Sequence, residues 1–167
     1  MWLVVLGLGG CATTSRDSVS LDPAWHLNGK LGVVSRDRRG SFGLDWQQFE
    51  GGYEIDLLGP LGMGVARVRR AGNQVTLEMP GEAPITATNA DELLYRATGL
   101  AIPVTPMRHW VLGEPAPGRF RARDDGFRQY GWDIAYQRFE DGLPMRMTVS
   151  RAEARLTLIV RRWEVRP

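Results

Sequence analysis

Hydrophobic and polar residues alternate along most of the chain after residue 24. In WHLNGKLGVV (25–34), Trp25, Leu27, Leu31 and Val33 fall on one face and the polar residues fall on the other. Successive side chains of a β-strand point to opposite faces, so this period of two predicts a strand with one buried face. The same alternation recurs in seven further segments, which are residues 41–46, 53–58, 64–70, 74–79, 129–139, 144–150 and 154–165. We therefore expect a mainly β protein, an antiparallel meander of eight or nine strands.

The segment 129–139 is treated as a single strand. Its alternation places Tyr130, Trp132, Ile134 and Tyr136 on the buried face. The Asp141-Gly142 pair that follows is typical of a tight turn between two strands.

Two short helices are predicted in the middle of the chain. In TNADELLYRATG (88–99), Asn89 and Glu92 form a capping pair, and Gly99 stands where a helix ends in a left-handed residue. In TPMRHWVLG (105–113) we expect Thr105 to be the N-cap. Pro106 then takes the first helical position and Gly113 ends the helix.

A sheet of this length with one apolar face must curl around that face or pack against another layer. Two mid-chain helices are natural covers for the opening of such a barrel. The inner face is rich in Trp, Leu, Met and Tyr, which would either fill a core or line a cavity for a lipid-like ligand, and composition does not decide between the two. The inward residues predicted to line such a cavity are Trp25, Leu27, Leu31, Phe42, Leu44, Trp46, Ile55, Leu57, Trp132, Ile134, Met145, Met147 and Leu158.

Length and composition indicate one folded domain. The chain has 167 residues, of which 43% are hydrophobic and 24% charged, as in ordinary globular domains. We assign that domain to residues 24–167. The formal net charge of +2 is too small to argue for nucleic-acid binding.

The N-terminal segment predicts lipidation. Residues 1–10 are uncharged and apolar, too few to span a bilayer, and are interpreted as a short or truncated lipoprotein signal peptide. LGGC (8–11) then has the form of a lipobox, in which Cys11 would be acylated and become the mature N-terminus. Residues 11–23 would be the lipidated cysteine and a flexible polar tether. The alternative is an N-terminal buried strand with a structural cysteine.

Groups for catalysis or metal binding do not converge in this sequence. His26 and His109 have no His or Cys neighbour at metal-ligand spacing, and no serine lies in a nucleophile elbow. We expect no enzymatic activity and no cofactor. The basic run RVRR (67–70) is interpreted as a solvated strand face, with attraction to anionic head groups as a weaker alternative.

The stretch LLGPLGMG (57–64) places an apolar residue where a turn tip is expected. Leu61 lies between Pro60 and Gly62, although turn tips are normally polar. From these residues alone, Leu61 is expected to fold back under the sheet.

Several stretches together resemble the LolB family of outer-membrane lipoprotein receptors. They are WQQ (46–48), GPLG (59–62), GNQVTLE (72–78), ADELLYRATGLAIPV (90–104), MRHWVLGEPAPG (107–118) and the terminal RRW (161–163). The resemblance covers residues 25 to 163. It implies an unclosed antiparallel β-barrel with a hydrophobic cavity, covered by short α-helices.

The resemblance also implies a function. A receptor of this family accepts acylated lipoproteins from a LolA-type periplasmic carrier and places them in the outer membrane, to which its own lipid anchors it. Pro60, Leu61 and Gly62 match the family's protruding loop, whose exposed leucine is important for membrane insertion. The expected partners are the carrier, the lipoprotein clients and outer-membrane lipid, and we expect a monomer that faces the periplasm and binds no nucleic acid.

Two other functions remain open at this point. A scaffolding outer-membrane lipoprotein would have a packed barrel and a large exposed apolar patch for an assembly partner. A small hydrolase would need a nucleophile beside a base, and none is visible.

Overall fold

The computed structural model of the chain describes residues 23–36 and 38–166. The predicted signal peptide, Cys11 and nearly all of the predicted tether lie outside the described residues. Within them, eleven strands form one antiparallel sheet, and two α-helices and one short 3-10 helix lie in its connections. In chain order the elements are β1 (Trp25–Ser35), β2 (Arg39–Phe49), β3 (Gly52–Leu58), η1 (Pro60–Gly62), β4 (Gly64–Ala71), β5 (Gln74–Glu78), β6 (Ile85–Ala87), α1 (Ala90–Thr98), α2 (Val104–Trp110), β7 (Phe120–Arg123), β8 (Gly126–Gln129), β9 (Trp132–Glu140), β10 (Leu143–Arg151) and β11 (Ala154–Val165).

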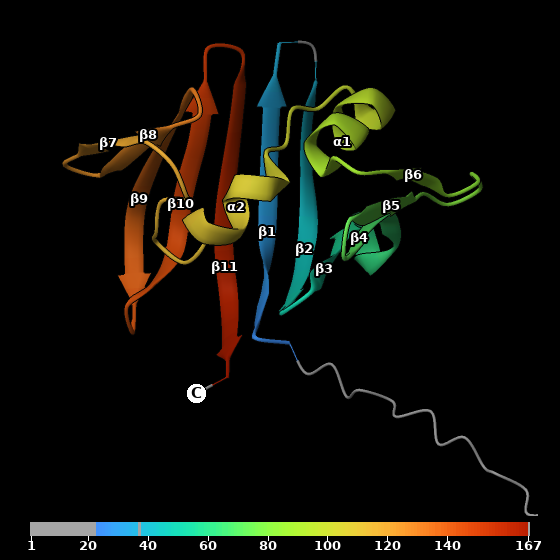
Figure 1. Cartoon of the computed structure of the whole chain (residues 1–167), viewed down its shortest axis with the longest axis horizontal. Helices are drawn as coiled ribbons and strands as arrows, with labels where there is room; N and C mark the ends of the chain where they lie inside the picture. Colours follow the sequence, from blue (N-terminus) through green and yellow to red (C-terminus); the bar gives the residue numbers. More distant parts are fainter. Residues whose placement is uncertain (1–22, 37, 167) are drawn as a thin grey trace, which may run out of the picture.

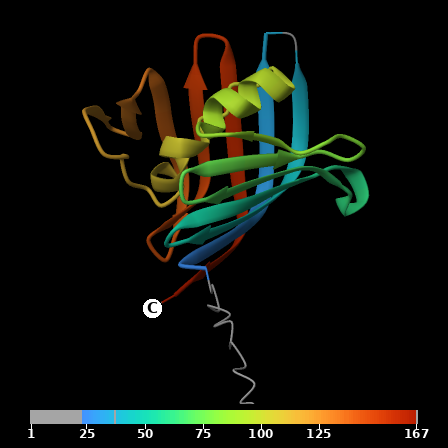
Figure 2. The same cartoon turned by 45° about the vertical axis from the view of Figure 1, so that its right-hand side comes forward.

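The sheet is an open barrel. Its strand order is β6-β5-β4-β3-β2-β1-β11-β10-β9-β8-β7. The first and last strands of the chain, β1 and β11, pair at the centre of the sheet, and β6 and β7 are its edge strands, each paired on one side only. Both edge strands are short, with three and four residues, which limits the backbone that they leave open to other chains. Figures 1 and 2 show the sheet curling around α1 and α2, which connect the two edges across its concave face. The prediction of an unclosed barrel with a helical cover is confirmed.

Alternation builds one continuous core on the inner face. Along β1 the inward side chains are buried and the outward ones are half-buried or exposed. Gly29 lies on the inner side of a bulge where the pairing of β1 with β11 shifts by one residue. A Cβ at this position would lie 2.4 Å from the carbonyl oxygen of Ile159, so only glycine allows the two strands to approach here.

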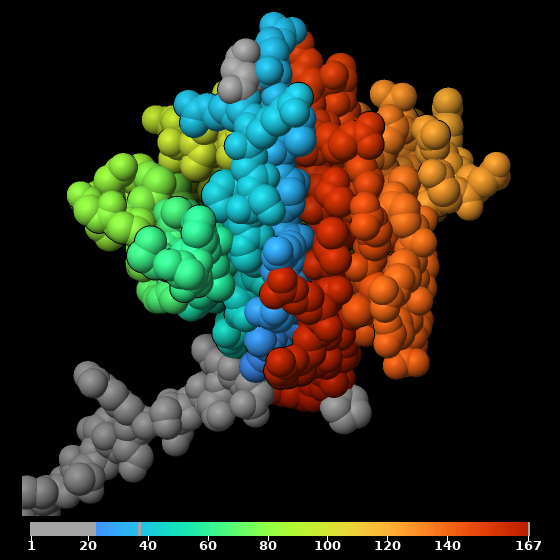
Figure 3. Space-filling model, turned by 180° about the vertical axis from the view of Figure 1, so that it is seen from behind, coloured from blue at the N-terminus to red at the C-terminus, as the bar shows by residue number. Residues whose placement is uncertain are grey.

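The outer face of the sheet is polar and is formed largely by β2, β1, β11, β10 and β9, which lie side by side in Figure 3. The two ends of the described chain meet at one end of this face. The N–H of Arg166 donates to the carbonyl of Ala24 at 3.1 Å, next to the register pair Trp25–Val165.

The strand count was predicted too low. The prediction missed β6 and β7, because three or four mostly exposed residues carry no alternation. It also missed β8, which does alternate, with Phe127 and Gln129 buried, but has only four residues, the last of which was assigned to the strand over 129–139. The single strand over 129–139 was also wrong. Tyr130 has a positive φ of 51° and is 58% exposed in the turn between β8 and β9, so it does not belong to the inner face.

The first helix was predicted correctly and the second only in part. Asn89 caps α1 by accepting from the backbone N–H groups of Asp91 and Glu92, and Gly99 ends it with a φ of 69°. The second helix begins at Val104, so Thr105 is not its N-cap and Pro106 is its third residue. A side chain of the neighbouring helix bonds Thr105 instead, which the sequence pattern does not reveal.

Candidate functional site: a covered apolar interior and an exposed apolar tip

The interior of the barrel holds a small apolar void between the sheet and the helices. Its volume is about 20 Å³, close to the space of a single water molecule. The lining is apolar, and Trp46 Nε1 is its one side-chain nitrogen or oxygen. The residues around the void are Leu31, Leu44, Trp46, Ile55, Leu57, Val68, Leu94, Ile102, Val104 and Met107.

All thirteen residues predicted to line a cavity face the interior. Ten of them are buried in the core, and Phe42, Leu57 and Met145 are partly buried against it. Five of the thirteen lie around the void, which are Leu31, Leu44, Trp46, Ile55 and Leu57. The other eight pack elsewhere in the core, so the interior is nearly filled in this structure. That any of the thirteen contacts an acyl chain stays a prediction.

Five residues around the void were missed by the sequence analysis. Val68 had a usable signal, because the alternation in β4 places it on the inner face. Leu94 and Met107 are buried positions of the two helices, and Ile102 and Val104 come from the start of α2 and the connection before it. Helical periodicity indicates that such residues are buried, but not that they face β2 and β3 across a barrel.

The C-terminal end of α2 is fixed to the sheet by a buried amide. The Gln129 side chain is 2% exposed and accepts from Trp110 Nε1 and from the backbone N–H of Ala116, each at 2.8 Å. It also donates to the carbonyl of Ala116 at 2.6 Å. Nearby, the Tyr136 hydroxyl donates to the carbonyl of Trp110 at 2.7 Å. No sequence pattern indicated this role, because Gln129 falls at the start of the strand predicted over 129–139.

The opposite end of the helical cover, at α1 and the start of α2, makes fewer hydrogen bonds than the end at Gln129. One oxygen of the Asp91 carboxylate on α1 accepts from both the backbone N–H and the hydroxyl of Thr105, at 3.0 and 3.1 Å. Burial raises the pKa of Asp91, and the hydrogen bonds from Thr105 act in the opposite direction. Arg38 donates to the carbonyl of Thr98 at 2.8 Å. Towards the void, this end presents only apolar side chains.

The connection between β3 and β4 carries an exposed apolar tip. Leu61 is 100% exposed and Met63 is 67% exposed. Leu61 adopts a left-handed conformation, with φ 63° and ψ 16°, which costs a leucine about 1–2 kcal/mol. Backbone bonds from Gly59 N–H to Met63 O and from Gly62 N–H to Gly59 O close the loop. Leu61 therefore does not fold back under the sheet, and the expectation drawn from its residues alone was wrong.

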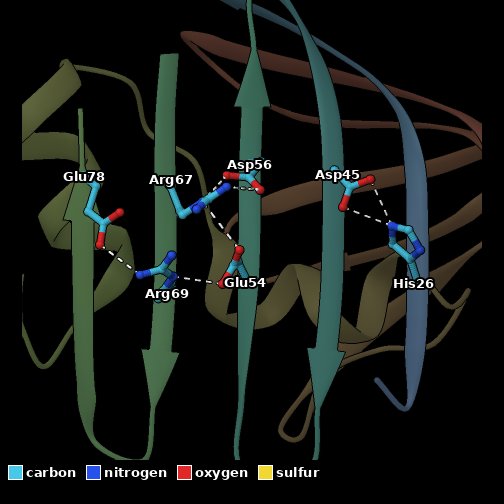
Figure 4. A network of polar contacts seen from close by, with 7 residues as sticks. All are labelled: His26, Asp45, Glu54, Asp56, Arg67, Arg69 and Glu78. Atoms are coloured by element: carbon cyan, nitrogen blue, oxygen red, sulfur yellow. Dashed lines mark hydrogen bonds and ion pairs between the residues drawn. The ribbon is translucent and has the colours of Figure 1, made fainter. Parts of the chain in front are cut away.

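The basic run that follows the tip is largely neutralised on the outer face. Arg67 bonds both carboxylate oxygens of Asp56, at 2.5 and 3.1 Å, and Arg69 bridges Glu54 and Glu78. Figure 4 shows these side chains on neighbouring strands, on the face turned away from the helices. The interpretation of this run as a solvated strand face is thus confirmed. The structure adds that Arg67 and Arg69 form ion pairs with carboxylates on the neighbouring strands.

His26 belongs to the same outer face. Its Nε2 lies 2.9 Å from the Asp45 carboxylate, which also accepts from Asn28 (Figure 4 shows the His26 contact). Burial alone would raise the pKa of Asp45, but the hydrogen bonds from His26 and Asn28 hold it below its usual value. These contacts join β1 to β2 and give His26 a structural partner.

No helix among residues 23–36 and 38–166 has the length and hydropathy needed to cross a bilayer.

Comparison with known proteins identifies the family. The family model described as "Outer membrane lipoprotein LolB" matches residues 23–163. Outer-membrane lipoprotein LolB of Thiobacillus denitrificans is 36% identical, with 96% of this chain and 93% of that protein covered. LolB of Cellvibrio japonicus is 30% identical, with 98% and 94% covered.

A solved structure shows the same fold at low identity. A LolA superfamily protein from Nitrosomonas europaea superposes with a TM-score of 0.52 and 12% identity, over 87% of each chain. At this identity the likeness concerns the fold alone. The match of the family model over residues 23–163 and the two relatives show that the chain belongs to the LolB family of outer-membrane lipoproteins.

Proposed function

We propose that this protein is an outer-membrane receptor that accepts acylated lipoproteins from a LolA-type periplasmic carrier and inserts them into the membrane. The observation that carries the proposal is the apolar interior under a two-helix cover, in a chain of the LolB family. Cys11 would carry the lipid anchor, and the domain would face the periplasm. No chemical step on the client is required, so the role is not catalytic.

Acyl chains would enter only if the cover moves. Each buried methylene contributes about 0.8 kcal/mol, so an acylated protein needs an apolar pocket to cross water. A void of about 20 Å³ holds no acyl chain. The side of the cover nearest the void contacts the sheet through apolar side chains, which can separate and then be replaced by an acyl chain of similar polarity. The Gln129 contacts would hold the other end in place during this movement.

Leu31, Leu44 and Ile55 would be among the first side chains to contact an entering chain, because they already surround the void. The remaining predicted residues would be reached only as the barrel opens further. Transfer from the carrier would need no nucleotide, since a difference in affinity between donor and acceptor is sufficient.

The exposed tip is proposed to contact the bilayer during insertion. Burying one leucine yields about 1.5–3 kcal/mol, which is enough for transient contact and too little for anchoring. Leu61 and Met63 are already exposed, so the tip needs no rearrangement to reach lipid. The permanent attachment would come from Cys11.

A transfer assay tests the proposal. The full chain with Cys11→Ser, which removes the anchor, is mixed with a purified carrier–lipoprotein complex without nucleotide, and the lipoprotein is followed by size-exclusion chromatography. We expect the lipoprotein to move onto this chain. If a compatible carrier retains its lipoprotein while this chain is shown to be folded, the receptor function is contradicted.

The nearly filled interior favours one second candidate, a scaffold whose barrel is a solid core. Hydrogen exchange with and without a carrier–lipoprotein complex separates the two functions. A receptor should lose protection around residues 94–107 when loaded and keep it at Trp110 and Gln129. A scaffold should show no change under the helical cover.

A further inference from the structure

The β1–β2 and β10–β11 hairpins and the β8–β9 turn lie at the end of the sheet that is remote from the chain termini. Because neighbouring strands are antiparallel, these connections share one end, and the first and last described residues lie at the other. The β1–β2 and β10–β11 hairpins stand next to each other at the top of Figure 1, and the β11 terminus is at the bottom. The Leu61 tip lies elsewhere, on the side of the barrel. Strand β3 ends at Leu58 opposite Gly43, below the top of β2, and Figures 1 and 2 show β3 and β4 crossing the barrel below the two hairpins.

The adjoining connections form a basic groove. An open groove of about 650 Å³ runs between the two hairpin tips, the end of α1 and the β8–β9 turn. Among the described residues its lining holds four arginines and one acidic residue, a net charge of +3, and these are Arg36, Arg38, Arg128, Arg151 and Glu153. Asp37, between two of these arginines in the sequence, lies outside the described residues. Tyr95, which is 59% exposed, forms part of its rim.

The arginines of this groove are less neutralised than those of the outer face. Arg36 pairs with Glu153, but Arg38 bonds a backbone carbonyl and Arg151 stacks over Trp132 at 4.5 Å, so both keep an uncompensated charge. Arg128 has no hydrogen bond or ion pair with any described residue. In the register it lies between Arg121 on β7 and Asp133 on β9, and the Asp133 carboxylate bonds Arg123 instead. The groove therefore concentrates positive charge that the described carboxylates cancel only in part.

We propose that this groove is a docking surface for anionic phospholipid head groups. The inference rests on the proposed function, and it adds the surface by which the domain is oriented on the membrane. Guanidinium groups bind phosphate through paired N–H donors. The exposed Tyr95 on the rim of the groove favours a lipid surface over an acidic protein, because aromatic and basic groups together bind the membrane interface.

The tether is long enough for this orientation. Cys11 and Trp25 are 14 residues apart in the sequence, and an extended chain of that length spans about 50 Å. Strand β1 has 11 residues and is about 36 Å long. A chain anchored through Cys11 can therefore turn its far end towards the bilayer. Since the anchor already holds the domain at the surface, weak head-group contacts are sufficient to orient it.

Vesicle binding tests the groove directly. The full chain with Cys11→Ser is sedimented with vesicles of phosphatidylglycerol and phosphatidylcholine, or of phosphatidylcholine alone, at low salt. We expect binding only to the anionic vesicles, and loss of binding at high salt because exposed charges are screened. Replacing Arg36 and Arg128 by Ser should weaken binding by about fivefold for each arginine, or about 25-fold for the pair. Replacing both by Lys should preserve most of it.

A matched control removes the same charge from β10 and β11, towards the end of these strands that is remote from the groove. Arg146 and Arg161 are exposed on β10 and β11 and make no hydrogen bond or ion pair within the described part of the chain. Arg146→Ser with Arg161→Ser should leave vesicle binding within about twofold, since these side chains lie outside the groove. An equal loss in this control, or full binding by Arg36→Ser with Arg128→Ser, would overturn the proposal.

The transfer assay distinguishes this failure from failure of the receptor function. The Arg36→Ser, Arg128→Ser variant should accept the lipoprotein from its carrier at the normal rate. If it binds anionic vesicles normally but no longer accepts the lipoprotein, the groove docks an acidic protein and the lipid assignment is wrong. If the chain with intact arginines accepts no lipoprotein but still binds anionic vesicles in a salt-sensitive manner, the receptor function is contradicted. The assignment of the groove as a head-group site would then stand.

Discussion

Two apolar regions of this protein show how differently the same residue types can serve one task. Leu44 is 2% exposed in the barrel interior, and Leu61 is 100% exposed at the β3–β4 tip. The interior leucine is part of the packed core, so it stabilises the fold whether or not it also contacts an acyl chain. The tip leucine packs against nothing and adopts a conformation that costs free energy. Substitutions in the interior should therefore change stability and function together, whereas substitutions at the tip should change function alone.

The largest effect is expected in the interior. Leu44→Asn would place an amide beside the apolar void, where Trp46 Nε1 is the one polar side-chain atom among the lining residues, so most of the amide's hydrogen-bonding capacity would stay unsatisfied. We expect the free energy of unfolding to fall by about 3–5 kcal/mol, measured by denaturant titration. In the fraction that remains folded, acyl binding should weaken. An unchanged midpoint with unchanged binding would show that Leu44 neither packs nor lines the entry site.

The next effect is expected at the fixed end of the cover. Gln129→Leu would leave Trp110 Nε1 and the backbone N–H of Ala116 buried without their acceptor. Each unsatisfied buried donor costs about 1–3 kcal/mol, so we expect the two together to lower the free energy of unfolding by about 2–6 kcal/mol, measured by thermal unfolding. Gln137→Leu, at an exposed position of β9, is the matched control and should change stability by less than about 0.5 kcal/mol. Equal effects of the two substitutions would contradict the role assigned to Gln129.

Two buried tyrosines allow a comparison of substitutions that each remove a single hydroxyl group, with smaller expected effects on stability. The hydroxyl of Tyr136 donates to Trp110 O, whereas the buried hydroxyl of Tyr53 has no hydrogen-bond partner of normal geometry among the residues that the structure describes. Tyr136→Phe should cost about 1 kcal/mol, and Tyr53→Phe should be neutral or stabilising, because only the first removes a bond that was made. Calorimetry of both variants checks the difference. A larger loss in Tyr53→Phe than in Tyr136→Phe would show that Tyr53 has a partner.

Alkaline pH tests the same tyrosine in another way. Burial raises the pKa of Tyr53 to about 12, against 10.0 for a free tyrosine. In the unfolded chain the hydroxyl loses its proton near pH 10, so the stability that the neutral form contributes is complete below that pH and is lost as pH rises towards 12. Tyr53→Phe should remove this part of the decline. If the variant and the unsubstituted protein lose stability in parallel between pH 10 and 12, Tyr53 is not responsible.

The smallest effect on stability, with a large effect on function, is expected at the tip. Leu61→Glu replaces a side chain that makes no packing contact, so unfolding should change by less than about 0.5 kcal/mol. The variant should still accept lipoproteins from the carrier but fail to insert them into membranes, because a charged tip is repelled by the bilayer interior. Normal insertion by a folded Leu61→Glu protein would contradict the membrane role of the tip.

Local chemistry explains which elements were predicted correctly. A long alternating segment such as that of β1 specifies a strand with a definite inner face. Asn89 and Gly99 mark the two ends of α1, because each forms its hydrogen bonds with residues only a few positions away. Thr105 was misassigned because Asp91, 14 residues earlier, bonds it. A contact between distant segments leaves no local pattern, and the same reason applies to Gln129.

The sequence by itself determined the inner face of the sheet, the first covering helix and the family, because these depend on periodicity and on neighbouring residues. The closeness of β1 and β11, the nearly closed interior and the full exposure of Leu61 were decided only in three dimensions. So was the basic groove, whose four arginines come from the β1–β2 and β10–β11 hairpins and from β8. They are adjacent because the sheet pairs its first strand with its last, and pairing between distant segments is a property of the whole chain.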